Sequence, residues 1–180
     1  VGAPGGAGSA RLDDPDNEGT DRPRGQGGAP PGPGEPLTST VDANLLLYAS
    51  DTASAYHEQA LRFLEEWARG PGLVYVFWPT LLGYVRIATH PSVFDRPLPP
   101  EDAIANVERL LRLPHVRSPG EDERFWETFR HVSDEANVRG NLVPDAHVVA
   151  LMIAHGVPAI WTHDRDYRRF RGIEVLDPFP

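Results

Sequence analysis

The sequence predicts an α/β protein in which helices cover both faces of a parallel β-sheet. Short apolar runs typical of buried strands recur after residue 37. Between them lie segments with apolar residues at three- and four-residue spacing, which is the helical period. Strands that alternate with helices in this way form parallel sheets, because each helix carries the chain back for the next strand.

The domain begins with a β-prone segment, followed by helices. The stretch LTSTVDANLLLYA predicts a strand that ends near Asp42 and turns into helical structure. Ser54 is the predicted N-cap of the next helix, which ends at Gly70-Pro71. The run LVYVF at 73–77 is a predicted buried strand, and Pro79 opens a helix after it.

The rest of the domain repeats this alternation. The predicted elements are, in order, a helix around 104–111, a short strand at 115–117, a helix from Phe125 that fades near Gly140, a helix from Pro144 to Gly156, a strand at 159–162 and an edge strand within 173–179. Such sheets bind their ligands at the carboxyl ends of the strands, where the connections diverge.

Residues 1–37 differ from this domain in composition. Of the 17 Gly and 19 Pro in the 180-residue chain, 10 Gly and 7 Pro lie in the first 36 residues, which contain no aromatic side chain. Such a segment buries too little apolar surface to offset chain entropy, so we predict a disordered tail over 1–37 and one domain over 38–180. Val at position 1 and a bias to Gly, Ala, Pro and Arg favour an upstream GTG start assigned too early in a GC-rich genome.

The composition excludes several kinds of chemistry. The chain has no Cys, and all 17 basic residues are Arg. Disulfides, thiolate nucleophiles, Cys-rich zinc sites, Schiff bases and P-loops are therefore excluded. No apolar run is long enough for a membrane span and no signal peptide is evident, so we expect a cytoplasmic protein. The net charge of −9 disfavours extended binding along a nucleic-acid duplex and fits a site that gathers divalent cations.

Three aspartates are predicted to meet at one edge of the sheet. Asp42 and Asp164 each follow a predicted strand, and Asp145 lies in the first turn of a helix. A lone Asp at a helix start is more often a cap than a ligand, but the joint placement of three favours a site. Clustered carboxylates stay ionised together when they bind Mg²⁺ or Mn²⁺, which activates water and neutralises a phosphodiester.

The same residues carry a family resemblance. VDANLLLYA, WPTLLGYVRIATHPSVF, GNLVPDAHVVALMIAHG and THDRDYRRFRGIEVLDPF resemble the successive motifs of PIN-domain ribonucleases, most closely VapC toxins of the mycobacterial type. The resemblance implies a three-layer α/β/α sandwich, Mg²⁺-dependent cleavage of RNA, a VapB-like antitoxin that blocks the site, and a homodimer. It also places Asp42, Asp145 and Asp164 on the family's acidic positions.

One position departs from the family pattern. Many PIN domains carry a Glu in the helix after the second strand, where this sequence has Gly83. Asp166, Glu58 or a water molecule is then left to complete the site. Gly83 also permits close approach of another backbone or of a bulky ligand.

Several polar residues near these acids allow two interpretations. Asn44 either contacts a phosphate or metal-bound water, or caps a turn. Thr162 is a candidate partner for a carboxylate, and His163 for substrate. His147 lies roughly 200° around its helix from Asp145 and so points away from it.

The run RDYRRFR over 165–171 suits single-stranded RNA, because Arg contacts phosphates and aromatic rings stack on bases. A solvated turn with its aromatic rings in the core is the alternative. We expect a mixture, with Phe170 buried and one or two Arg facing RNA.

The leading hypothesis is a metal-dependent endoribonuclease toxin. The second is a PIN-like module that binds RNA or a partner after losing catalysis with its fourth acid. A third, a metal-dependent phosphatase, is disfavoured in its dehalogenase-like form by the absence of Lys.

Overall fold

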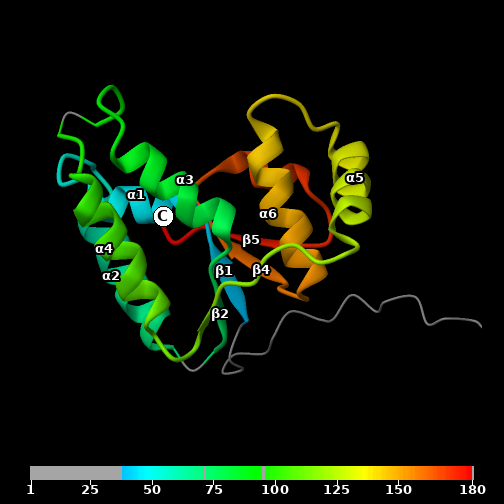
Figure 1. Cartoon of the computed structure of the whole chain (residues 1–180), viewed down its shortest axis with the longest axis horizontal. Helices are drawn as coiled ribbons and strands as arrows, with labels where there is room; N and C mark the ends of the chain where they lie inside the picture. The colour runs from blue at the N-terminus through cyan, green and yellow to red at the C-terminus, as the bar shows by residue number, and fades with distance from the viewer. Residues whose placement is uncertain (1–37, 71, 95, 180) are drawn as a thin grey trace, which may run out of the picture.

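A five-stranded parallel sheet forms the centre of the molecule. The computed structural model describes residues 38–179 apart from 71 and 95 (Figure 1). The predicted tail over 1–37 lies outside these residues. The sheet has helices on both faces, which confirms the predicted fold class (Figure 1).

The strand order is β3-β2-β1-β4-β5, and every pair is parallel. The strands are β1 (Ser39–Val41), β2 (Val74–Tyr75), β3 (Val116–Arg117), β4 (Ala159–Trp161) and β5 (Glu174–Leu176). From β1 the chain adds β2 and β3 on one side, whereas β4 and β5 lie on the other. The connections therefore diverge between β1 and β4, and a crevice is expected at the carboxyl ends of these two strands.

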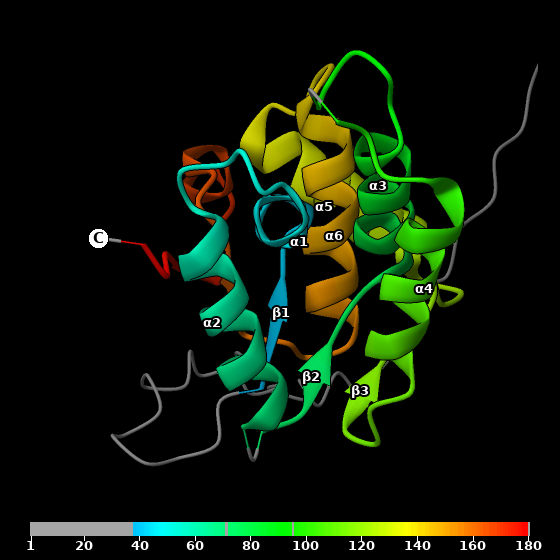
Figure 2. The same cartoon turned by 90° about the vertical axis from the view of Figure 1, so that its left-hand side faces the viewer.

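The helices form two layers (Figures 1 and 2). One layer contains α1 (Ala43–Ser50), α2 (His57–Arg69), α3 (Trp78–Ala88) and α4 (Pro100–Leu111). The other contains α5 (Phe125–Ala136) and α6 (Leu142–Ala154), and a 3-10 helix, η1 (Arg165–Arg169), follows β4.

Helix α6 is the most deeply buried helix. Seven of its 13 residues are buried, and Val149, Leu151 and Met152 are fully inaccessible to solvent. A helix that is apolar on nearly all sides packs in the interior, here between α5 and the sheet. Its position, and so that of its first turn, is therefore fixed by the core.

Two predicted helix starts are wrong. Helix α2 begins at His57, because Ser54 forms a separate turn in which its Oγ accepts from the Tyr56 N–H at 3.2 Å. Helix α6 begins at Leu142, two residues before Pro144. Proline is tolerated there because the N–H groups of the first turn have no partner within the helix. No helix in the described part of the chain is long and apolar enough to cross a membrane.

Candidate active site

The site begins where β1 and β4 end side by side. Val41 is paired in register with Trp161, and the Asp42 N–H donates to the Trp161 carbonyl at 3.0 Å. Asp42 is the N-cap of α1, and its Oδ1 accepts from the Ala43 N–H at 2.7 Å. The Thr162 hydroxyl donates to Asp42 Oδ2 at 3.0 Å. This confirms Thr162 as a partner of a carboxylate.

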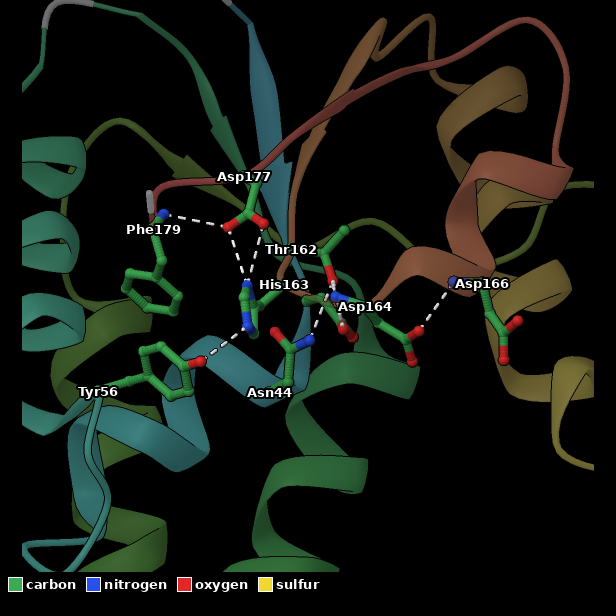
Figure 3. Close-up of polar contacts among 9 residues, drawn as sticks. Asn44, Tyr56, Thr162, His163, Asp164, Asp166, Asp177 and Phe179 are labelled. Atoms are coloured by element: carbon green, nitrogen blue, oxygen red, sulfur yellow. Dashed lines mark hydrogen bonds and ion pairs between the residues drawn. The ribbon is translucent and has the colours of Figure 1, made fainter.

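The Thr162 hydroxyl connects three parts of the site (Figure 3). Besides donating to Asp42, it accepts from Asn44 Nδ2 at 3.0 Å and from the Asp164 N–H at 2.9 Å. Thr162 is only 1% exposed, so these bonds fix its position. Asn44 does not cap a turn with its side chain. Its Oδ1 is buried and has no hydrogen-bond partner among the described residues.

Asp164 and Asp145 reach the same edge from other elements. Asp164 is the N-cap of η1, where its Oδ1 accepts from the Asp166 N–H at 2.8 Å. Asp145 lies in the first turn of α6. Burial, followed by the charges of Asp42, Asp164 and Asp166, raises the pKa of Asp145 to about 7, although a hydrogen bond from Tyr167 lowers it.

The pKa of Asp42 is raised as well. Burial raises its pKa, hydrogen bonds from Thr162 and Ala43 lower it, and the charge of Asp164 raises it. The structure therefore brings the three predicted acids into one electrostatic neighbourhood. The main causes of the pKa shifts of Asp42 and Asp145 are burial, neighbouring carboxylates and hydrogen bonds.

The two candidates for a fourth acid are placed differently. Asp166 acts on the pKa of Asp145 through its charge, although its carboxylate also pairs with Arg169 at 3.1 Å. Glu58 is exposed on α2, and its Oε2 lies 3.8 Å from Arg62 Nη1. Its charge is not among the main causes that shift the pKa of Asp42 or Asp145. Asp166 is thus the nearer of the two to the acidic cluster.

Gly83 lies in the middle of α3. A Cβ atom built there would meet nothing within 4 Å. The interpretation that Gly83 permits close approach of another backbone is therefore wrong for the described residues. The glycine leaves open space into which a longer side chain fits.

Sequence reasoning missed the role of Tyr167. Its side chain is 1% exposed, and its hydroxyl donates to Asp42 Oδ1 at 3.4 Å. Burial, followed by the charges of Asp42 and Asp145, raises the pKa of Tyr167 well above its usual value, so it remains a donor. Its position in a basic run marked it only as a core or stacking residue. Phe170 is buried as predicted.

Both histidines near the acids are hydrogen-bonded to other carboxylates. His163 binds Asp177 through Nδ1 and Tyr56 through Nε2, at 3.0 and 3.2 Å. His147 binds Glu121 at 2.7 Å, consistent with its predicted direction away from Asp145. Asp177 was also missed, although it follows a strand as Asp42 and Asp164 do.

The donor set suits a hard cation that keeps part of its water shell. Within residues 38–179, positions 71 and 95 aside, no three His, Asp or Glu side chains form a ready-made metal cage. Mg²⁺ prefers oxygen ligands, retains several waters and needs only one or two carboxylates directly. The residues present therefore fit Mg²⁺ or Mn²⁺.

Comparison with known proteins identifies the family. Residues 40–173 match the family model described as PIN domain. Ribonuclease VapC48 of Mycobacterium tuberculosis is 49% identical over 143 residues, which cover 79% of this chain and 99% of VapC48. The chain belongs to the VapC family of PIN-domain ribonuclease toxins. The predicted recognition and enzyme class are confirmed.

Solved VapC structures share the fold at low sequence identity. VapC20 of Mycobacterium tuberculosis, described as a Sarcin-Ricin loop cleaving toxin, aligns with a TM-score of 0.56 at 19% identity, over 76% of this chain and 98% of that one. The DNA-bound VapBC of Salmonella typhimurium aligns with a TM-score of 0.55 at 17% identity, over 79% and 99%. This VapC therefore has the fold seen in free and complexed relatives.

The raised pKa of Asp145 predicts a pH-dependent gain in stability for Asp145→Asn. Between its ordinary pKa of 3.8 and about 7, the folded state holds a proton that the unfolded chain releases, so this group lowers stability as pH rises through that interval. Without divalent cations, we expect the variant to melt several degrees above wild type at pH 8. Each kcal/mol of added unfolding free energy raises the melting temperature of a domain of this size by roughly 2–4 °C. At pH 4 the gain should nearly vanish. Differential scanning calorimetry at both pH values measures this.

Asp134→Asn on α5 is the matched control, because Asp134 is exposed and is not among the main charges that raise the pKa of Asp42 or Asp145. A gain for Asp145→Asn that is equal at both pH values, or no larger than that of the control, would contradict the prediction.

Proposed function

We propose that this VapC is a Mg²⁺-dependent endoribonuclease in which Asp42, Asp145 and Asp164 hold the ion. The observation that carries the proposal is the convergence of these carboxylates. Burial is the largest cause of the raised pKa of Asp42 and Asp145, and the charges of neighbouring acids add to it. Such a cluster is costly for the protein alone and becomes favourable with a bound cation. Mn²⁺ meets the same requirements.

The residues around the acids have distinct tasks in this mechanism. A bound divalent ion supplies an activated water and neutralises charge on the scissile phosphodiester. Thr162 and Tyr167 hold the Asp42 carboxylate from two sides, at 3.0 and 3.4 Å. Asn44 holds the Thr162 hydroxyl in place, because its Nδ2 donates to Thr162 Oγ1 at 3.0 Å. No nucleophilic side chain is required.

The arginines of η1 provide the contact with RNA. Arg165, Arg168 and Arg169 are exposed on the helix that Asp164 caps. Their guanidinium groups suit phosphates of a single strand that crosses the acidic edge. The positive charge of these arginines therefore lies next to Asp164, outside the cluster of acids.

The first test of this function is cleavage by acid-to-amide variants. We expect purified wild-type protein to cut structured RNA with Mg²⁺ or Mn²⁺ and not with EDTA. Asp42→Asn, Asp145→Asn and Asp164→Asn should each lower the rate by about a hundredfold or more, because each removes a negative charge that holds the ion, directly or through a bound water. Gel analysis of end-labelled RNA gives the rates.

Glu58→Gln is the control, as its carboxylate is exposed and paired with Arg62. Cleavage in EDTA, or full activity in the Asp42 and Asp145 variants, would refute the mechanism. RNA binding without cleavage of any substrate would instead favour a PIN-like binding module that lacks the fourth acid at Gly83.

Gly83→Glu tests whether a fourth acid strengthens the site. The space around Gly83 admits the side chain, and Glu has a higher helix propensity than Gly. We expect the variant to fold, to require about tenfold less Mg²⁺ for half-maximal cleavage, and to keep its RNA specificity. Gly83→Ala separates the effect of the carboxylate from that of helix stabilisation. An unchanged Mg²⁺ requirement in Gly83→Glu would place Gly83 outside the metal site.

We also propose that a small VapB-like antitoxin blocks this toxin. An apolar groove of about 430 Å³ opens between α1, α2, α3 and α4, in the layer seen in Figure 2. It is lined by Leu46, Leu61, Leu64, Trp67, Leu81 and Leu110, among others. A groove of this composition suits the apolar face of an amphipathic helix. The shared fold with the VapBC complex of Salmonella typhimurium supports this assignment.

Leu61→Arg should weaken the complex with the antitoxin encoded beside this toxin. Leu61 lines the groove and is 36% exposed, so the variant should fold and keep its ribonuclease activity. Its affinity for the antitoxin should fall about tenfold or more, because a charge must be buried in the groove. Leu73→Arg is the control, since Leu73 is 43% exposed and is not among the groove residues. Equal affinities of the two variants would contradict the assignment.

The family resemblance further leads us to propose a homodimer. Trp78 and Leu82 lie one turn apart on α3 and are 43% and 63% exposed. Apolar side chains of this size favour an interface. Light scattering on the toxin without antitoxin should give twice the chain mass of 19.8 kDa, and a monomer would contradict the proposal.

A further inference from the structure

A fourth carboxylate stands at the same sheet edge as the acidic cluster. Leu176 of β5 is paired in register with Trp161 of β4, and the Thr162 N–H donates to the Leu176 carbonyl at 2.9 Å. Asp177 therefore leaves the sheet beside the loop formed by residues 162–164. Its charge acts on Tyr48, as do the charges of Asp42 and Asp164.

Asp177 is bound to the middle residue of that loop. His163 Nδ1 lies 3.1 and 3.0 Å from the two Asp177 oxygens. Because a carboxylate only accepts hydrogen bonds, Nδ1 carries the proton. His163 Nε2 lies 3.2 Å from the Tyr56 hydroxyl, so both ring nitrogens are engaged (Figure 3).

Aromatic packing holds this group together. The Tyr56 ring stacks on Phe179, with centroids 4.9 Å apart and planes 18° apart, and lies 4.7 Å from the His163 ring. Phe179 is 5% exposed, and its N–H donates to Asp177 Oδ1 at 3.0 Å. Segments from the start of α2, the end of β4 and the end of β5 thus meet beside the acids (Figure 3).

We propose that Asp177 is a positioning residue that, through His163, sets the geometry of the acidic site. His163 is flanked directly by Thr162, whose hydroxyl orients Asp42, and by Asp164. A shift of the His163 backbone therefore moves both neighbours. This inference rests on the proposed function of the acids but concerns residues outside their cluster.

Two features favour positioning over direct catalysis. His163 has no ring nitrogen left for substrate, since Asp177 and Tyr56 occupy both. The hydrogen bond from the imidazole N–H also stabilises the negative charge of Asp177 at an edge that already carries three carboxylates. Partners of this kind beside a metal site alter affinity or rate by about 10–100-fold when removed.

The experiment compares Asp177→Ala with Asp177→Asn, which keeps an acceptor for the Nδ1–H. Glu121→Ala is the matched control, because it breaks the other close His–carboxylate pair, Glu121 with His147 at 2.7 Å. Three quantities are measured on the full chain: kcat and KM for RNA with Mg²⁺, the Mn²⁺ affinity by calorimetry, and hydrogen exchange of the amides of residues 162–166. Thermal unfolding of each variant reports its stability.

We expect Asp177→Ala to lower kcat and Mn²⁺ affinity by about tenfold or more, with KM nearly unchanged. Exchange of the Asp164 and Asp166 amides should accelerate, because their acceptors Thr162 and Asp164 move. Asp177→Asn should restore all three quantities to within about threefold, and Glu121→Ala should leave them as in wild type.

Wild-type values in Asp177→Ala, or equal losses in Asp177→Ala and Glu121→Ala, would overturn the inference. The inference would also be overturned if Asp177→Asn folds but does not restore kcat, Mn²⁺ affinity and amide exchange. If Asp177→Ala does not fold, amide exchange in Asp177→Asn and in Tyr56→Phe tests the inference instead. Tyr56→Phe removes only the outer bond, so we expect faster exchange at 162–166, and unchanged exchange would overturn the inference. The exchange measurement needs neither metal nor RNA, so it stands even if cleavage proves metal-independent and the proposed function fails.

Discussion

The parallel pairing of β1 with β4 is the constraint on which the site depends. It places Asp42 beside Thr162, and from that contact follow the hydrogen bonds of Thr162 to Asn44 and Asp164. A shift of one residue in this register would turn alternate side chains to the other face of the sheet and separate the pair. Strand pairing that is needed for the core thus also sets the spacing of the polar groups.

The core also brings together groups that repel one another. Helix α6 is held by its apolar surface, so Asp145 in its first turn cannot move away from Asp42 without disturbing the packing around Val149 and Leu151. The raised pKa of both acids reflects first their burial and then the charges of neighbouring carboxylates. Packing in the core thus keeps the carboxylates close together at the edge of the sheet, where their negative charge favours a cation.

The acidic, basic and apolar features of the molecule lie on different surfaces. The acids lie at the carboxyl ends of the strands, and exposed arginines follow on η1. The apolar groove lies within the layer of α1 to α4. The group around His163 ties the acidic edge to the C-terminal segment, so the last described residues of the chain are structurally linked to the site.

Much of this protein could be predicted from its sequence. The alternation of short apolar runs with helical periods determines a parallel α/β fold, and the positions of Asp42 and Asp164 after strands determine that they face one edge. These features are local, because they depend on residue order and on the period of each element. The motifs that resemble VapC toxins come from the same local segments.

Only the tertiary structure decided which side chains actually meet. Tyr167 reaches Asp42 across 125 positions, and Asp177 reaches His163 across 14, through strand pairing and packing that no local pattern contains. The contacts of the Tyr56 ring with Phe179 and His163 likewise join residues that are far apart in the sequence. Side-chain contacts depend on how strands and helices assemble in three dimensions, whereas the sequence by itself determined the elements and the edge at which the acids gather.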